Sequence, residues 1–264
     1  RFPIAYHRGV ISIAGLCVYP VKSCRGVAVT EALLTAAGLD HDREWMVVTP
    51  EGRFVTQRDE PRLALVAARL DADALTLSAA GDGGVSVPLD LRGAATTVTV
   101  WRDRCRAFDQ GEDAARWLGE FVGRPLRLVR FDTAGRRLSD TAWTGGVEAS
   151  NRFSDGFALL AISRASLDDL NARLAVPLPM DRFRPNLVLD GLPPYGEDGL
   201  GDLLAGAARL RRVKPCTRCV ITTTDQATGA VTGGEPLRTL KSYRWDAALR
   251  GVAFGQNLIV VAGA

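Results

Sequence analysis

Histidine is scarce in this 264-residue sequence, which contains only His7 and His41. A structural zinc site normally takes four Cys or His ligands, most often supplied by two Cys-x-x-Cys or His pairs. The chain has one Cys-x-x-Cys, formed by Cys216 and Cys219, and its other cysteines form no second pair. These other cysteines are Cys17, Cys24 and Cys105. The sequence therefore argues against a four-ligand zinc site.

Long apolar runs are also absent. No segment has the uninterrupted apolar length of a membrane span, and the first ten residues, RFPIAYHRGV, lack the apolar region of a secretory signal. Five cysteines, an odd number at irregular spacing, argue against a disulfide framework. We therefore expect a cytoplasmic protein with reduced thiols and no membrane span.

The charge balance is nearly even, with a net charge of +3. Hydrophobic residues make up 47% of the chain and charged residues 24%, which is typical of a globular protein of one large or two ordinary domains. Nucleic-acid surfaces concentrate Lys and Arg on one face. The densest basic run here, RLRRVK at 209–214, is instead typical of the solvated face of a strand. We expect no nucleic-acid partner.

Short β-rich segments dominate the first half of the chain. Segments 10–21, 27–35, 43–50 and 53–57 read as strands, and the turn signal at 50–52 predicts a hairpin between the last two. Further strands are expected at 63–70, 74–80, 85–89 and 95–101. Closely spaced strands separated by turn residues predict a sandwich or a small barrel.

Two segments have helical periodicity. In 111–123 the apolar residues fall on one face, and Gly123 can end the helix. In 163–174 leucines recur at helical spacing behind Ser163 or Ser166 as possible N-caps.

The segment between these helices, 133–156, is weakly periodic and reads as a connection or an active-site loop. Strands are expected again at 183–191, 208–213, 219–225 and 257–261, with a short helix at 236–243. The whole pattern predicts a β-rich α+β protein of two units, divided somewhere near residues 125–150.

Cys216 and Cys219 have several possible uses. A redox Cys-x-x-Cys opens a helix, whose N-terminus lowers the thiol pKa. Here a β-branched run, 220–224, follows the pair and favours a strand, which argues against that use. Two buried apolar side chains, or a less common role for one thiolate, stay open on the residues alone.

Eight stretches, in order along nearly the whole chain, match the pattern of one protein family. They are YPVKSCRGV (19–27), LDHDREWMVV (39–48), FVTQRDEPRL (54–63), SRASLDDLNARL (163–174), FRPNLVL (183–189), CTRCVITTTDQATG (216–229), PLRTLKSYR (236–244) and FGQN (254–257). Together they resemble MOSC-domain proteins with an N-terminal MOSC barrel, a group that includes the mitochondrial amidoxime-reducing component and its bacterial relatives. The resemblance implies two β-barrel-like domains with a few helices, an N-terminal MOSC β-barrel domain at 8–130 and a MOSC domain at 131–264.

The resemblance also implies a molybdenum cofactor, in which a molybdopterin holds molybdenum through its dithiolene. The second cysteine of Cys-x-Arg-Cys, here Cys219, would be the metal ligand and a catalytic residue, with Cys216 structural. A soft thiolate suits a sulfur-bound transition metal, and one protein ligand suffices when the cofactor supplies the others.

The phosphate of such a cofactor needs hydrogen-bond donors and positive charge. The resemblance assigns cofactor binding to Lys22, Ser23, Arg43, Arg184, Asn186, Thr217, Arg218, Cys219 and Asn257. Arg43 and Arg184 adjoin strands that should be half buried, where an unpaired charge is costly, so their burial would imply an anion. Asp225 is a candidate for proton delivery, although an Asp beside a turn more often caps the turn.

The chain departs from the family pattern at two places. Gly156 and Phe157 stand where the mitochondrial members have Thr-Ser, so two side-chain hydroxyls are missing and a different substrate preference is expected. The sequence ends at VVAGA, short of the last strands of a MOSC barrel, without a ferredoxin-like extension and with no membrane anchor ahead of the fold, so a trimmed C-terminus is expected.

The implied activity is molybdenum-dependent reduction of N-hydroxylated small molecules: amidoximes, hydroxylamines or N-hydroxylated bases. Nothing in the sequence resembles a Rossmann fingerprint or a four-cysteine iron–sulfur site. The two electrons would therefore come from an external reductase or a small electron carrier. The alternative function is a cofactor carrier or sulfur-handling protein without substrate turnover, which would use the same anchor residues.

Overall fold

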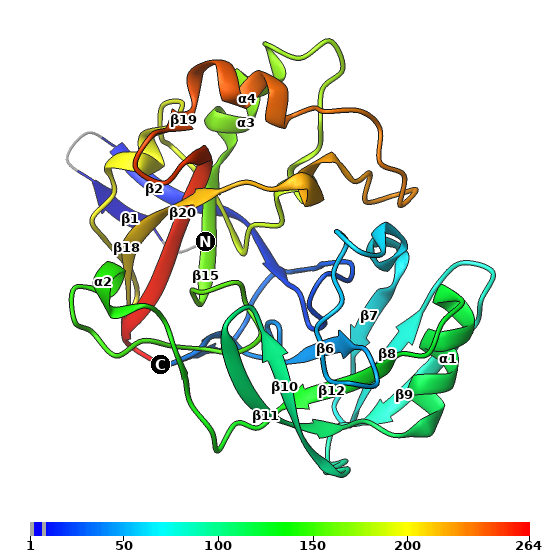
Figure 1. The fold of residues 1–264 in the computed structure, drawn as a ribbon. Coiled ribbons are helices and arrows are strands. Elements are labelled where there is room, and N and C mark those ends of the chain that lie inside the picture. The colour runs from blue at the N-terminus through cyan, green and yellow to red at the C-terminus, as the bar shows by residue number, and fades with distance from the viewer. Residues whose placement is uncertain (1–2, 7–8) are drawn as a thin grey trace.

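The computed structural model describes residues 3–6 and 9–264. His7 and the first residue of the predicted N-terminal domain, Arg8, lie outside the described residues. Two groups of strands make up the fold (Figure 1). One contains both ends of the chain and carries α3 and α4, and the other contains β6 to β12 and α1.

The larger sheet has nine strands and combines residues from both ends of the chain. Its order is β1-β2-β16-β15-β20-β18-β17, with β3 added to β2 and β19 to β20. The strands are β1 Pro3–Tyr6, β2 Gly9–Val18, β3 Val27–Val29, β15 Leu159–Ser163, β16 Leu187–Asp190, β17 Asp202–Ala205, β18 Ala208–Thr217, β19 Trp245–Asp246 and β20 Gly251–Ala262. Among the strand pairs described for this sheet, only β15 and β16 are parallel. The strands from residues 9–29 thus belong to the sheet of the C-terminal half, and the predicted division at residue 130 stays a prediction.

The other strands form smaller sheets. A four-stranded sheet has the order β10-β11-β12-β6, and β7, β8 and β9 form a three-stranded meander. The strands are β6 Trp45–Val48, β7 Ala67–Leu70, β8 Ala74–Ser78, β9 Gly84–Pro88, β10 Ala95–Val100, β11 Asp103–Asp109 and β12 Arg127–Phe131. The two-stranded pairs are β4 Leu34–Thr35 with β5 Gly38–Leu39, and β13 Arg137–Leu138 with β14 Ser150–Asn151.

The β-rich α+β class is confirmed, with four α-helices in the described part of the chain. The strand order recorded for each sheet is an open path over those residues, so closure into barrels is not confirmed. No helix of the described residues is long and apolar enough to cross a membrane.

The two longest predicted helices form as expected. α1, Glu112–Val122, ends at Gly123, whose φ of 87° is left-handed and favours glycine. α3, Arg164–Asn171, starts at Ser163, whose hydroxyl accepts from the Ser166 backbone N–H. The short helix α4, Leu237–Tyr243, also matches its prediction, and α2, Thr141–Thr144, lies in the segment expected to be a connection.

The strand predicted at 219–225 is wrong, because Val220–Thr223 form a 3-10 helix directly after Cys219. Two threonine hydroxyls stabilise this turn: Thr222 Oγ1 donates to the Cys219 carbonyl at 2.9 Å, and Thr223 Oγ1 donates to the Val220 carbonyl at 2.7 Å. Side chains that bond to nearby backbone compete with the extended form, and this outweighs the β propensity of the run.

Two other strand predictions hold only in part. Residues Pro61–Leu65 form a 3-10 helix ahead of β7, because Pro61 begins it and Glu60 caps it. Segment 53–57 forms no full strand, but the antiparallel bridge between Val48 and Phe54 confirms the predicted hairpin.

The buried Glu44 carboxylate forms ion pairs with arginines from both halves of the chain. Its side chain is 3% exposed, and its carboxylate accepts from Arg130 Nε at 2.6 Å and contacts His41 Nδ1 at 3.0 Å. Arg152 Nε lies 3.8 Å away. Burial opposes ionisation, but the His41 contact and the two arginines outweigh it and lower the Glu44 pKa.

We expect Glu44→Gln to destabilise the protein by about 3 kcal/mol at pH 7, because it leaves Arg130 without its carboxylate and Arg152 without one of its two. A carboxyl whose folded-state pKa is depressed stabilises the fold above its unfolded pKa, and this contribution is lost as pH falls. The gap between parent and variant should therefore shrink below about pH 4.3. Urea unfolding at pH 7 and pH 4 measures it, with exposed Glu120→Gln as the control; a gap that does not change with pH would contradict the ionic account.

Candidate functional site

A cavity of about 150 Å³ gathers nine of the ten predicted site residues. These nine are Lys22, Ser23, Arg43, Arg184, Asn186, Thr217, Arg218, Cys219 and Asn257. They come from loops after β2, before β6, before β16 and after β18, and from β18 and β20 themselves. The fold thus brings together residues that are up to 235 positions apart in the sequence.

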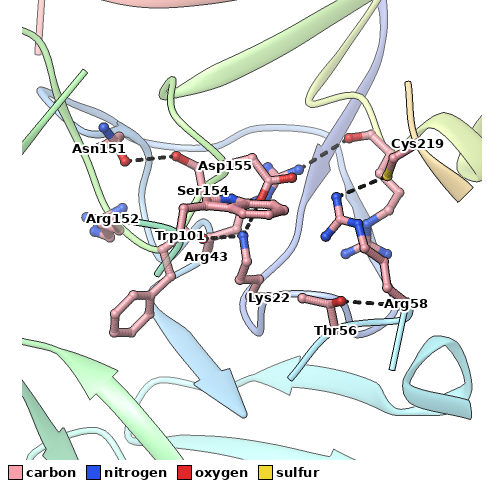
Figure 2. Close-up of polar contacts among 12 residues, drawn as sticks. Lys22, Arg43, Thr56, Arg58, Trp101, Asn151, Arg152, Ser154, Asp155 and Cys219 are labelled. Carbon is pink, nitrogen blue, oxygen red and sulfur yellow. Dashed lines mark hydrogen bonds and ion pairs between the residues drawn. The ribbon is translucent and has the colours of Figure 1, made fainter. Parts of the chain in front are cut away.

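Cys219 lies at the start of the 3-10 helix Val220–Thr223, where its backbone is still extended. Its sulfur accepts a hydrogen bond from Arg58 Nη2 at 3.1 Å (Figure 2). Cys216 also lines the cavity, and its sulfur instead accepts from Arg218 Nη1 at 2.9 Å. Both thiols are free, and each is paired with its own guanidinium group.

Arg43 and Arg184 lie on the ring of Tyr19. Their guanidinium carbons are 4.3 Å and 4.4 Å from the ring centroid. Arg43 is neutralised by a contact with buried Asp42, which overcomes the effect of burial and raises the Arg43 pKa. Burial lowers the pKa of Arg184, which has no such carboxylate. The site therefore holds one paired and one unpaired guanidinium group against the same tyrosine ring.

Asn186 connects this arginine pair to the large sheet. Its Oδ1 accepts from Arg43 Nη1 at 2.8 Å and from the Leu160 backbone N–H at 3.2 Å, and its Nδ2 donates to the Cys17 carbonyl at 3.1 Å. A buried amide with these partners fixes three chain segments at the edge of the cavity.

Lys22 is buried, and its ammonium donates to the Phe153 carbonyl at 2.8 Å and to Asp155 Oδ1 at 2.5 Å. Burial lowers the Lys22 pKa. Burial also opposes ionisation of Asp155, but the neighbouring Lys22 charge outweighs it and lowers the pKa of that carboxyl. Asp155 therefore stays ionised at the cavity wall, with 59% of its side chain exposed.

Buried Arg137 shapes the loop that carries Asp155. Its Nη1 donates to the Arg152 and Ser154 carbonyls at 2.8 and 2.6 Å and to Asn151 Oδ1 at 2.5 Å. Sequence reasoning did not single out Arg137, because a residue in a Gly- and Ser-rich connection carries no pattern that predicts burial.

The cavity carries a surplus of positive charge. Five cationic side chains and one carboxylate, Asp155, line it. Among the described residues, Arg58, Arg184 and Arg218 have no carboxylate within 4.0 Å. The buried Arg218 Nε also lacks any hydrogen-bond partner. Unpaired donors and charges are costly in a buried place, so this set favours an anionic ligand.

Three of the predicted anchors have strained backbones. The φ angles of Ser23, Arg43 and Arg184 are 68°, 47° and 56°, in the left-handed region that non-glycine residues rarely adopt. Such conformations cost free energy and gather at functional sites, where the surrounding structure holds them.

Two of the predicted residues lie on strands at the cavity. Asn257 is in β20, and its Nδ2 donates to the Lys214 carbonyl at 3.2 Å, where the register of β18 shifts. Thr217 is the last residue of β18 and directly precedes Arg218.

Asp225 is the one predicted site residue that the structure does not bring to the cavity. Its Oδ1 accepts from the backbone N–H groups of Ala227 and Thr228 at 3.0 and 2.9 Å, and Arg182 Nη2 donates to its Oδ2 at 2.8 Å. The carboxylate thus caps a turn, which the sequence had offered as the alternative to proton delivery.

Sequence reasoning missed several lining residues, among them Thr56, Arg58, Ser154 and Asp155. Arg58 lies within the family-like stretch 54–63, but nothing local to that stretch singles out Arg58 as the residue that contacts the thiol. Gly156 and Phe157, the departure from the family pattern, both line the cavity.

Comparisons with known proteins identify the family of this chain. The family model described as "MOSC N-terminal beta barrel domain" matches residues 10–125, and that of the "MOSC domain" matches residues 148–262. "Mitochondrial amidoxime-reducing component 1" of Homo sapiens is 42% identical over 245 residues, covering 88% of this chain and 72% of that protein.

The same component of Mus musculus is 40% identical, covering 88% of this chain and 71% of that protein. A solved structure of a Bordetella bronchiseptica protein matches with 24% identity and a TM-score of 0.37, over 45% of this chain and 89% of that chain. The identity to the first two relatives, over most of both chains, shows the family. The chain belongs to the MOSC-domain proteins that also carry the MOSC N-terminal beta barrel domain, together with the mitochondrial amidoxime-reducing components.

Proposed function

We propose that this protein holds a molybdenum cofactor through Cys219 and reduces N-hydroxylated small molecules with electrons from an external reductase or a small carrier. The observation that supports this most is a cysteine sulfur in a cavity whose cations outnumber its carboxylates five to one. The names of the relatives give the reaction class, amidoxime reduction, and the MOSC domain gives the class of cofactor.

The residues present fit such a cofactor. Its metal would take the Cys219 sulfur, because a soft thiolate suits molybdenum bound through sulfur. Its phosphate would take the free donors of Arg184 and Arg218 and the ammonium of Lys22, since phosphate pairs well with guanidinium groups. The Arg218 Nε, buried without a partner, is a donor that a bound anion can satisfy. When bound, the cofactor supplies a two-electron redox centre.

The protein's own groups would prepare this centre. Arg58 donates to the Cys219 sulfur and so holds it in place at the cavity wall. The Lys22 and Asp155 pair fixes the loop at 154–157 beside the cavity. In the net reaction the N–O bond of the substrate breaks, two electrons and two protons are taken up, and the oxygen leaves as water.

The alternative, a cofactor carrier without turnover, uses the same anchors. Turnover of benzamidoxime by molybdenum-replete protein, with a dithionite-reduced viologen as the electron donor, tests the difference. We expect benzamidine to form in proportion to the bound molybdenum, and its absence from a fully loaded sample would favour the carrier. The cytoplasmic location and the identity of the electron donor stay predictions.

We expect Cys219→Ser to remove most of the molybdenum. Parent protein from a host that makes the cofactor should hold close to one metal per chain. Changes to the groups that surround a metal ligand lower metal affinity roughly tenfold. The variant should lose at least this much affinity, because it removes the ligand itself. Elemental analysis measures this, with Cys216→Ser as the matched control that keeps its metal. Equal metal in the Cys219 variant, or zinc in the parent, would sink the assignment.

Arg184→Met should separate cofactor binding from stability. In the cofactor-free protein, removing an unpaired, largely buried charge next to Arg43 should leave the thermal midpoint equal or higher. In the loaded host, the molybdenum content should fall, because an anion donor is lost. Scanning calorimetry and elemental analysis give the two readouts, and Arg209→Met, at an exposed ion pair with Asp202, is the control. A clear loss of apo stability would mean that Arg184 is structural.

A further inference from the structure

A second cavity, of about 560 Å³, shares a wall with the cavity around Cys219, which we call the cofactor cavity. Residues 155–157 line both cavities. The other walls of the second cavity are rich in aromatic rings, those of Phe54, Trp101 and Trp143, which join Phe157. We call this second cavity the vestibule.

Trp101 lines the vestibule from a backbone position that a bulky residue rarely occupies. It is the first residue of the two-residue turn between β10 and β11, with a φ of 56°. Hairpin turns favour glycine or asparagine at such positions, and a bulky residue there is rare and strained. The side chain is also 47% exposed. A strained, exposed tryptophan points to a purpose other than folding.

The indole ring is held close to the candidate centre. Trp101 Nε1 donates to Asp155 Oδ1 at 3.2 Å, and the ring centroid lies 5.2 Å from that of Phe54. The Arg58 guanidinium lies over the indole at 4.8 Å and donates to the Cys219 sulfur. One guanidinium group therefore separates the ring from the sulfur, as Figure 2 shows for these residues.

The vestibule differs from the cofactor cavity in charge. Three cations and three carboxylates line it, so it lacks the five-to-one excess of cations found in the first cavity. Arg137 Nε is paired with Asp103 at 2.7 Å, and Asp155 with Lys22. Asp140 accepts from the Ala142 backbone N–H as the cap of α2. A balanced, aromatic cavity suits an uncharged, flat ligand and gives no preference to an anion.

We propose that the vestibule binds the aromatic ring of an uncharged N-hydroxylated substrate, with Trp101 and Phe157 setting a preference for aryl over alkyl compounds. The inference rests on the proposed function and specifies its substrate class. Ring stacking of this kind favours the aryl compound by about three- to tenfold in affinity. This proposal gives a role to Phe157, which departs from the family pattern, because it adds an aromatic ring where the mitochondrial members have a hydroxyl.

Binding of benzamidoxime and acetamidoxime to the cofactor-loaded protein, measured by equilibrium dialysis, tests the proposal without turnover. We expect the parent to bind the aryl compound about three- to tenfold more tightly. Trp101→Gly should abolish this difference. Trp245→Ala is the matched control and should keep it, because Trp245 is 51% exposed, lies near a lysine and is outside the vestibule.

Trp101→Gly also separates ligand binding from folding, because glycine adopts a φ of 56° without strain. We expect its thermal midpoint to stay within a few degrees of the parent's. Phe157→Ser provides a second variant, and its aryl preference in kcat/KM should fall by a similar factor. Equal binding of the two compounds by the parent, or an unchanged preference in both variants, would overturn the proposal.

The outcomes distinguish this proposal from the proposed function. If no N-hydroxylated compound is reduced by the loaded protein, the enzyme function fails, whereas a Trp101-dependent aryl preference in dialysis would still support the vestibule as an aromatic site. If both amidoximes are reduced at rates that Trp101→Gly and Phe157→Ser leave unchanged, the function stands and the vestibule proposal fails.

Discussion

The contact among Arg43, Asp42 and Asn186 is the constraint on which the arrangement depends. The Asp42 carboxylate accepts from the Tyr19 backbone and contacts Arg43, which in turn donates to Asn186. The three residues thereby join the segment before β6 to β2, β15 and β16 of the large sheet. The hydrogen bonds of such a buried charge pair form only when all of these segments are in place. The contact among the three residues therefore specifies how the two groups of strands meet.

The candidate site lies at this junction, and its position explains its chemistry. Loops from both strand groups converge there, and each contributes a donor or a cation, while the carboxylates that would balance them are used elsewhere. Asp42 neutralises Arg43, and Asp155 neutralises Lys22, which leaves Arg58, Arg184 and Arg218 for a ligand. The fold tolerates this surplus because the apolar clusters of the two groups supply its stability, and Leu159 of one cluster also lines the cavity.

Much of the fold was predictable because it rests on local patterns. The helix at 112–122 has one apolar face and a glycine stop, and the hairpin at 48–54 has its turn residues. The prediction failed at 220–223, where threonine hydroxyls favour a turn over the strand that β-branched residues suggest. Strands β12 and β15 were missed because their pairing partners lie far away in sequence, and β11 was missed because four of its seven residues are charged.

The sequence by itself indicated the kind of site: a motif with Cys219 as the proposed metal ligand, and Lys22, Arg43 and Arg184 as proposed anchors, each carried by a short local stretch with a recognisable pattern. Only the tertiary structure decided which charges stay unpaired, since pairing depends on contacts such as Lys22 with Asp155, 133 residues apart. It also placed Arg58 at the thiol, Trp101 beside Arg58, and Asp225 at a turn. Local sequence patterns identify residues of suitable chemistry and the elements that carry them. The distances between these residues, and their burial, arise only when remote segments pack together.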